Sequence, residues 1–458
     1  MSTISAISTA SGVGGIGIVR MSGEDCFPIL EKIFKPKNPQ KIEEIPGYHM
    51  KYGTIVNPKN EEIIDEVLVS YFKAPHSYTT ENMCEINSHG GAIVMRKILE
   101  LTLENGAELA EPGEFTKRAF INGRIDLSQA ESVIDIIQAK SEREVKASVK
   151  QLEGYLSEQI HGIKQEILDV LVDVEASIDY PEYDVEEVTN EKALNMLENI
   201  KEKLKKLSES FKNGKLVKDG IKTVIIGKPN AGKSSLLNAI LREDRAIVTN
   251  IEGTTRDTIE EFITVEGIPL KLIDTAGIRE AKDEVEQIGI DKAKELANEA
   301  DLVIAILDAS RTLSKEDRDI LNIASKKTSL IILNKTDLVQ KIDEKTEEIA
   351  ETNKRVVKIS ALNKTGIEEI FKEISDLFQF NQINFDNENM ITNIRHKNLI
   401  DHAINNVEQS IDTLKNKMPI DIIAIYIKNI LEDLSNITGE NVSEDIIQEI
   451  FSKFCLGK

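Results

Sequence analysis

Cysteine and tryptophan are scarce in this sequence, which has three cysteines and no tryptophan in 458 residues. The cysteines, Cys26, Cys84 and Cys455, lie far apart, and none belongs to a Cys-x-x-Cys pair. This spacing indicates neither a disulfide framework nor a zinc site.

Long apolar runs are also missing. None approaches the roughly 18 residues that a membrane-spanning helix needs, and a stretch such as 302–307 is typical of a buried strand. The N-terminus is polar and has no basic residue before Arg20. That pattern fits neither a secretory signal nor an Arg-rich transit peptide. We therefore expect a cytoplasmic protein that is not associated with a membrane.

Positive charge is in deficit. The chain has 57 Lys and Arg against 79 Asp and Glu, a net charge of −22. Such a chain repels nucleic acid unless its basic groups gather locally, so the composition gives no electrostatic footprint for RNA.

The length favours several domains, and the sequence changes character along the chain. Residues 1–118 combine short strands such as 17–20 and 66–72 with a helix near 91–104, which predicts an α+β domain. Residues 119–215 have helical spacing, broken near Pro181, which disfavours helix in its neighbour. Residues 216–383 alternate strands and helices as in a mostly parallel α/β sheet, and 384–458 are helical again. We expect a discontinuous helical domain that contains an inserted α/β domain, with two independent helical domains as the alternative.

A phosphate-binding loop begins the α/β region. Residues 227–234 fit G-x-x-x-x-G-K-[ST], after a predicted strand at 223–226 and before a helix that opens at Ser235. That context distinguishes the motif from a chance match in a glycine-rich loop. The loop amides and the helix N-terminus favour phosphate oxygens. Lys233 adds charge at the β- and γ-phosphates, and Ser234 offers a hydroxyl to Mg²⁺.

Three more nucleotide motifs follow in order. A strand at 270–273 leads to Asp274-Thr275-Ala276-Gly277, and another at 330–333 leads to Asn334-Lys335-Thr336-Asp337. A carboxylate at Asp337 can accept hydrogen bonds from N1 and the exocyclic amine of guanine, a donor pair that adenine lacks. Ser360-Ala361-Leu362 completes the base pocket. Together these motifs predict a GTPase with a P-loop fold.

The residue that activates water is less obvious. Signalling GTPases place a Gln directly after the Asp-x-x-Gly motif, but that position here is Ile278. Asn230 lies in the phosphate loop, the segment 253–257 (Gly-Thr-Thr-Arg-Asp) supplies hydroxyls, and Glu284 or Glu286 could reach back.

These residues, together with the terminal Cys-Leu-Gly-Lys at 455–458, resemble the MnmE (TrmE) family of potassium-dependent, tRNA-modifying GTPases over essentially the full length. The resemblance implies that K⁺ is held by Asn230, Thr249, Ile251 and Thr254, and Mg²⁺ by Ser234 and Thr255. It assigns catalysis to Lys233 and to Glu286, which would orient water, although Glu286 could also be an exposed carboxylate. The positions that would contact GTP are Asn230, Ala231, Gly232, Lys233, Ser234, Ser235, Thr249, Asn250, Ile251, Glu252, Gly253, Thr254, Thr255, Asp274, Thr275, Ala276, Gly277, Asn334, Lys335, Asp337, Ser360, Ala361 and Leu362.

A second glycine pattern, G-x-G-x-x-G at 12–17, does not indicate a dinucleotide fold. Residues 16–20 continue as a strand, and a helix is expected only after Ser22-Gly23, so the pattern predicts a tight turn.

For the N-terminal domain the resemblance implies a folate-binding, dimer-forming fold that takes 5-formyl- or methylene-tetrahydrofolate as a one-carbon source. Arg20, Glu85, Arg124 and Lys458 match that site. A carboxylate suits the donor nitrogens of a pterin, and cations suit the glutamate tail. Ordinary surface charges are the competing interpretation. Cys455 is a candidate catalytic thiol, with a small buried cysteine as the alternative.

By this resemblance the protein is a homodimer that acts with a flavoprotein of the MnmG (GidA) family on tRNA. It would add an aminomethyl or carboxymethylaminomethyl group at C5 of the wobble uridine. Two alternatives stay open: a GTP switch for assembly of ribosomes or RNA particles, and a GTPase whose N-terminal domain only dimerises.

Overall fold

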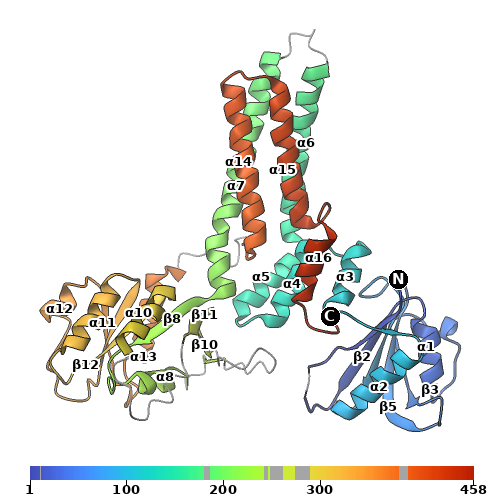
Figure 1. Ribbon diagram of the computed structural model, residues 1–458, viewed down its shortest axis with the longest axis horizontal. Coiled ribbons are helices and arrows are strands. Elements are labelled where there is room, and N and C mark those ends of the chain that lie inside the picture. Colours follow the sequence, from blue (N-terminus) through green and yellow to red (C-terminus); the bar gives the residue numbers. More distant parts are fainter. Residues whose placement is uncertain (11, 180–185, 242–245, 248–260, 274–288, 381–389) are drawn as a thin grey trace. The chain divides into compact units, whose positions relative to one another are not determined.

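A computed structural model describes residues 1–10, 12–179, 186–241, 246–247, 261–273, 289–380 and 390–458 (Figure 1). The chain forms two compact units. The first comprises Met1–Ile137, Val149–Lys201 and His402–Lys458, and the second comprises Gln138–Ser148 and Glu202–Asp401. Among the described residues, no helix combines the length and the apolar character that crossing a membrane requires.

The first unit contains a seven-stranded sheet in the order β3-β4-β5-β6-β2-β1-β7. Its pairings are antiparallel except for β1 with β7. Every second residue of β5 from Val67 to Tyr71 is buried, as expected for a sheet with one covered face. The covering helices are α1 and α2 (Figure 1). The elements are β1 (Ile4–Ile7), β2 (Gly17–Ser22), α1 (Cys26–Ile33), β3 (Phe34–Pro36), the 3-10 helix η1 (Ile42–Glu44), β4 (His49–Val56), β5 (Ile63–Phe72), β6 (Met83–Ser88), α2 (Ala92–Glu104) and β7 (Glu108–Leu109).

These elements confirm the predicted strands near 17–20 and 66–72, the helix near 91–104 and the helix after Ser22-Gly23. The sequence did not predict α3 (Glu114–Ile121), which has only eight residues. The helix shares an apolar cluster with α4 (Leu127–Gln138) and α16 (Glu444–Ser452), built on residues such as Ala119, Leu127 and Phe451. A helix this short has too little periodicity to stand out beside strand-like neighbours.

Long helices complete the first unit. α6 (Tyr155–Asp179) buries Ile163, Ile167, Val170 and Val174, three or four residues apart, and lies alongside α15 (Ile420–Thr438) (Figure 1). Parts of α7 (Glu186–Asp219) and α14 (Ile394–Lys415) also belong to this unit. The two helices are joined by ion pairs such as that between Lys415 and Glu198. The predicted break near Pro181 lies outside the described residues, between α6 and α7.

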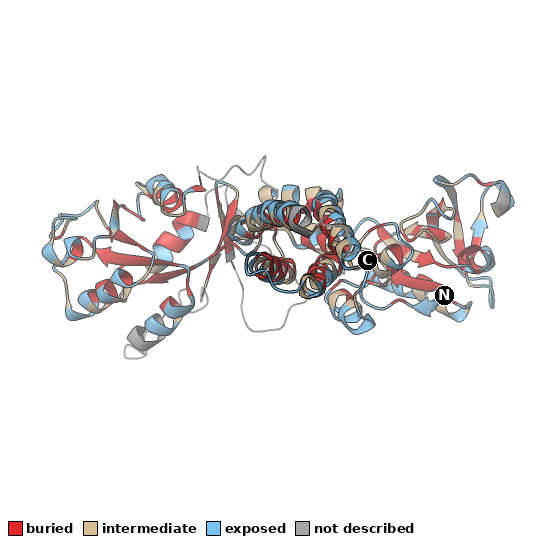
Figure 2. Cartoon of the chain, turned by 90° about the horizontal axis from the view of Figure 1, so that it is seen from above, coloured by how far each residue is buried: buried red, intermediate tan, exposed pale blue. Residues whose placement is uncertain are grey.

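The second unit contains the other seven-stranded sheet, in the order β14-β13-β12-β8-β11-β10-β9. The strands from β14 to β11 are parallel, and β10 and β9 are antiparallel. β12 and β13 are buried along their whole length, as parallel strands covered on both faces are (Figure 2). The elements are α5 (Glu142–Leu152, which also extends into the first unit), β8 (Ile221–Ile226), α8 (Lys233–Leu241), β9 (Ala246–Ile247), β10 (Glu261–Val265), β11 (Ile268–Leu272), α10 (Gly289–Glu299), β12 (Leu302–Asp308), α11 (Lys315–Ser325), β13 (Ser329–Asn334), α12 (Glu347–Ala350), β14 (Arg355–Lys358) and α13 (Ile367–Leu377). Because β8, β12 and β13 are parallel neighbours, the loops after them meet at one edge of the sheet.

Candidate functional site

The phosphate loop connects β8 to α8, as predicted. The ammonium group of Lys233 donates to the carbonyl oxygens of Gly227 at 2.7 Å and Lys228 at 3.0 Å, so the loop folds around its own lysine. Asn230 and Gly232 have positive φ angles of 63° and 103°. Only glycine suits the second position, because a Cβ there would also run into the side-chain amide of Asn334. Burial lowers the pKa of Lys233.

Asn334, at the end of β13, connects the phosphate loop to the predicted base pocket. Its side-chain nitrogen donates to the carbonyl oxygen of Ala231 at 2.9 Å, and its side-chain oxygen accepts from the amide of Ala361 at 3.0 Å. The residue is 2% exposed, so both bonds are shielded from water. Asp337 accepts from the hydroxyl of Ser360 at 2.5 Å, while Leu362 is largely exposed. The described motif residues are thus brought together at one edge of the sheet.

Lys335 makes an ion pair with Asp308, the last residue of β12, at 2.7 Å. Burial acts to raise the pKa of Asp308, but its hydrogen bonds from Lys335 and Ser310 outweigh that effect and leave the pKa below its usual value. Asp308 was not among the residues predicted from the sequence. A carboxylate at the end of a strand beside the phosphate-loop strand was the only available signal.

Several predicted residues lie outside the described part of the chain. They are Thr249, Asn250, Ile251, Glu252, Gly253, Thr254, Thr255, Asp274, Thr275, Ala276, Gly277 and Glu286. Of the predicted metal ligands, Asn230 and Ser234 are described, and both are exposed beside Lys233. Over the residues that the structure covers, no cluster of three or more His, Cys, Asp or Glu side chains is arranged to hold a metal.

The residues predicted to bind folate meet in the first unit. Arg20 on β2 and Glu85 on β6 are register partners, and their ion pair measures 2.7 Å. The Arg20 guanidinium also donates to the carbonyl oxygen of Gly457 at 3.1 Å, and that oxygen accepts from the Ser8 hydroxyl at 2.9 Å. These bonds bring the last residues of the chain to the sheet. Burial, followed by the nearby charge of Arg20, lowers the pKa of Lys458.

Tyr78 connects the fourth predicted residue, Arg124, to this group. The Arg124 guanidinium carbon lies 4.6 Å from the centre of the Tyr78 ring, and that of Arg20 lies 5.7 Å from the same ring. Arg124 also donates to the Tyr78 carbonyl oxygen at 2.7 Å. Phe115 lies beneath Arg20, with its ring centre 5.5 Å from the guanidinium carbon. Tyr78 and Phe115 were not predicted from the sequence, because an aromatic side chain in a loop or short helix has no distinctive pattern.

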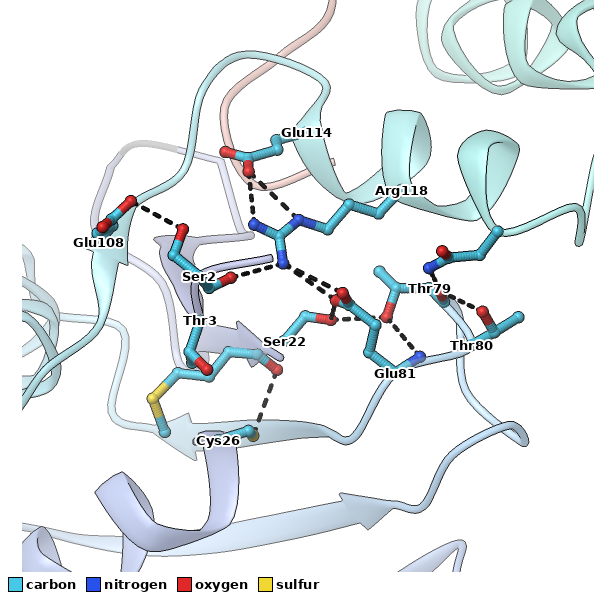
Figure 3. Close-up of polar contacts among 12 residues, drawn as sticks. Ser2, Thr3, Ser22, Cys26, Thr79, Thr80, Glu81, Glu108, Glu114 and Arg118 are labelled. Carbon is cyan, nitrogen blue, oxygen red and sulfur yellow. Dashed lines mark hydrogen bonds and ion pairs between the residues drawn. The ribbon is translucent and has the colours of Figure 1, made fainter. Parts of the chain in front are cut away.

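A buried arginine fastens the helix that carries Phe115. Figure 3 shows Arg118 of α3 between Glu114 and Glu81, at 2.7 and 3.1 Å, with a further bond to the carbonyl oxygen of Ser2 at 2.8 Å. Such a buried network of charged groups fixes the position of the helix. Cys455 is exposed, and its carbonyl oxygen accepts from the amide of Gly113 immediately before α3, at 3.4 Å.

Comparison with known proteins identifies the family. The family described as the MnmE helical domain matches residues 127–455, and the one described as the N-terminus of the GTP-binding protein TrmE matches residues 3–124. The tRNA modification GTPase MnmE of Acetivibrio thermocellus is 48% identical over 456 residues, which cover 100% of this chain and 99% of the relative. The proteins of the same name from Thermoanaerobacter pseudethanolicus and Clostridioides difficile are 49% and 48% identical, each over 456 residues that cover 100% of this chain and 99% of the relative.

Among solved structures, the G domain of the FeoB iron transporter of T. maritima is 25% identical and covers 34% of this chain and 98% of its own, with a TM-score of 0.26. That score is too low to support a conclusion about this chain.

The second unit is a P-loop GTPase domain, because its mostly parallel sheet carries a phosphate loop that Asn334 connects to the base motif. The chain also contains an N-terminal domain and a helical domain. With two family matches and relatives of nearly equal length, the chain belongs to the MnmE (TrmE) family. It is a GTP hydrolase of this tRNA-modifying family.

Proposed function

We propose that this chain hydrolyses GTP in a K⁺-dependent reaction and that hydrolysis serves the modification of C5 of the wobble uridine in certain tRNAs. The observation that carries the nucleotide part is the pair of side-chain bonds of Asn334, which connects the phosphate loop with the segment that contains Ala361. A base and its phosphates then bind to a single connected frame, which reduces the ordering cost of binding.

Guanine recognition is assigned to Asp337. Its carboxylate is oriented by Ser360 through one oxygen. A carboxylate has about four lone-pair sites, so it can still accept from N1 and the exocyclic amine of guanine.

The proposed ion sites use oxygen ligands. Asn230 and Ser234 carry an amide oxygen and a hydroxyl at the exposed mouth of the loop, ligands that suit K⁺ and Mg²⁺. Thr249, Ile251 and Thr254 would complete the K⁺ site and Thr255 the Mg²⁺ site. A bound K⁺ supplies positive charge at the phosphates, the role that an arginine finger has in other GTPases. Glu286 would orient water, since Ile278 cannot.

The N-terminal domain is proposed to bind 5-formyl- or methylene-tetrahydrofolate through Arg20, Glu85, Arg124 and Lys458. Glu85 would accept from the pterin, and the three cations suit the anionic glutamate tail. Lys458 lies near Arg20, and that proximity contributes to its lowered pKa. An added anion would relieve the repulsion between these cations. Cys455 is proposed as a catalytic participant at this site.

We further propose that the protein is a cytoplasmic homodimer and acts on tRNA with a flavoprotein of the MnmG family. The proposed domains are a folate-binding and dimerisation domain at 1–118, helical segments at 119–215 and 384–458, and a GTPase domain at 216–383. The product would be an aminomethylated or carboxymethylaminomethylated uridine.

Nucleoside analysis of bulk tRNA tests this proposal. Cells that lack the protein should lose the modified wobble uridine, and the unaltered gene should restore it, whereas a gene carrying Lys233→Ala should not. An unchanged uridine profile in the deletion strain would contradict the modification. Restoration of the modified uridine by Lys233→Ala would instead mean that the modification does not need GTP hydrolysis by this protein.

A further inference from the structure

Two buried carboxylates lie at either end of the connection between β12 and α11. Asp308 ends β12, Asp317 lies in the first turn of α11, and they are 5% and 2% exposed. Each pairs with a lysine from a nucleotide motif. Asp308 binds Lys335 of the base motif, and Asp317 binds Lys228 of the phosphate loop, both at 2.7 Å. One connection therefore contacts the base side and the phosphate side of the site.

The contacts of Asp317 exceed what a helix cap needs. One of its oxygens accepts from the amide and the hydroxyl of Ser314, at 2.9 and 2.8 Å, as part of a capping box. The same oxygen accepts from the Lys228 ammonium. The other oxygen is buried without a hydrogen-bond partner among the described residues. A neutral acceptor would satisfy the cap, and a buried carboxylate is costly unless a cation compensates it.

Lys228 transmits this contact to the phosphate loop. Its side chain is held by Asp317, while its carbonyl oxygen accepts from the ammonium of Lys233 and, at 3.3 Å, from the amide of Ala231. The loop between these contacts includes Asn230 in the left-handed region, a conformation that persists only where surrounding contacts enforce it. The ion pair thus fixes the position of Lys228, whose carbonyl oxygen accepts from the ammonium of the phosphate-binding Lys233.

We infer that Asp317 is a positioning residue for nucleotide binding: through Lys228 it holds the phosphate loop in the conformation that receives phosphates. This inference rests on the proposed GTP site and adds to it a residue outside all its motifs. It predicts that the charge of the pair governs nucleotide affinity, and not only the stability of α11.

The test is the affinity of the full-length protein for a fluorescent GDP with Mg²⁺. Asp317→Asn keeps an acceptor for the cap and removes the charge, and Lys228→Met keeps the aliphatic stem and removes the ammonium. Each should weaken affinity about tenfold, the scale of a charged hydrogen bond, and Lys228→Arg should recover most of the loss. The double variant should be no weaker than either single variant, because the two residues act as one unit.

Glu316→Gln is the matched control. It removes an exposed carboxylate from the same first turn of α11, so it should lower the unfolding temperature slightly and leave the affinity for GDP unchanged. If Asp317→Asn or Lys228→Met binds GDP like the unaltered protein, the positioning role is wrong. Should Asp317→Asn fail to fold, Lys228→Met, which lies outside the cap, decides the question. Failure of the unaltered protein to bind GDP would contradict the proposed GTP site instead.

Discussion

The side-chain nitrogen of Asn334 lies 2.9 Å from the carbonyl oxygen of Ala231, and this bond joins two motifs about a hundred residues apart in the sequence. Asn334→Asp preserves the acceptor for Ala361 but replaces the donor with an oxygen that faces the Ala231 carbonyl. We expect GDP affinity to fall at least about tenfold, because the buried Ala231 carbonyl oxygen would lose its donor and face a negatively charged acceptor. Asn322→Asp, which adds the same charge at an exposed position of α11, is the control.

The carboxylate of Asp337 should determine base preference. Asp337→Asn replaces one acceptor oxygen with an amide NH2 donor, which opposes the donors of guanine and complements the 2-oxo group of xanthine. Binding of GDP should weaken about a hundredfold or more, in the range seen when a site loses a hydrogen-bonding complement, while binding of XDP should strengthen. Fluorescence competition with both nucleotides measures this. Equal GDP affinity in the variant and the unaltered protein would mean that the base pocket is misassigned.

The amide of Asn230 should be needed for activation by K⁺. Because Asn230 has a φ of 63°, alanine there would strain the loop, whereas glycine adopts this conformation freely. Asn230→Gly should therefore remove the amide without backbone strain. Turnover of the unaltered protein should be much faster in KCl than in NaCl at equal ionic strength, and Asn230→Gly should show equal rates. No salt difference in the unaltered protein would contradict the K⁺ proposal and leave the GTP site intact.

Arg20 should contribute strongly to folate binding, since it contacts Glu85, Tyr78 and the carbonyl oxygen of Gly457. Arg20→Met should weaken binding of 5-formyltetrahydrofolate by at least about tenfold, because it removes a charged partner and releases the tail. Lys59→Met, at a largely exposed lysine, is the control. Calorimetric titration measures both. Unchanged affinity in Arg20→Met would place the folate site elsewhere.

One pH dependence follows from Glu440, which pairs with Lys164 at 2.6 Å. Burial acts to raise the pKa of Glu440, but the bond from Lys164 and its charge outweigh burial and lower the pKa below the usual value. The unfolded chain therefore binds the proton more readily, so the stabilisation is present above the ordinary glutamate pKa and is lost as pH falls through the folded one. Glu440→Gln should lower the free energy of unfolding by about 0.5 kcal/mol at neutral pH, the scale of a partly exposed ion pair.

Urea unfolding at neutral pH and at a pH below both pKa values measures this contribution. The difference between Glu440→Gln and the unaltered protein should disappear in acid. A difference that persists there would come from packing and not from the charge.

The sequence predicted those parts of the site that lie in continuous motifs. The phosphate loop from Gly227 to Ser234 and the motif at 334–337 could be located because strand, loop and helix follow one another along the chain. The contacts that fix these motifs could not be predicted in this way. Asp317 and Lys228 are 89 positions apart, and nothing in the local pattern of either residue indicates the other. Tyr78 escaped prediction for the same reason, because its importance comes from Arg20 and Arg124, which folding brings to its ring.

The register between β2 and β6 has a consequence for insertions and deletions. Gly17 pairs with Ser88 and Arg20 with Glu85, and alternate residues of a strand point to opposite faces of the sheet. Gaining or losing one residue inside β2 would either turn Arg20 toward the apolar side or bring a Cβ-bearing residue to the position of Gly17, against Met95. Length variation in this part of the chain should therefore be confined to the turn before Gly17, while β2 itself keeps a constant residue count.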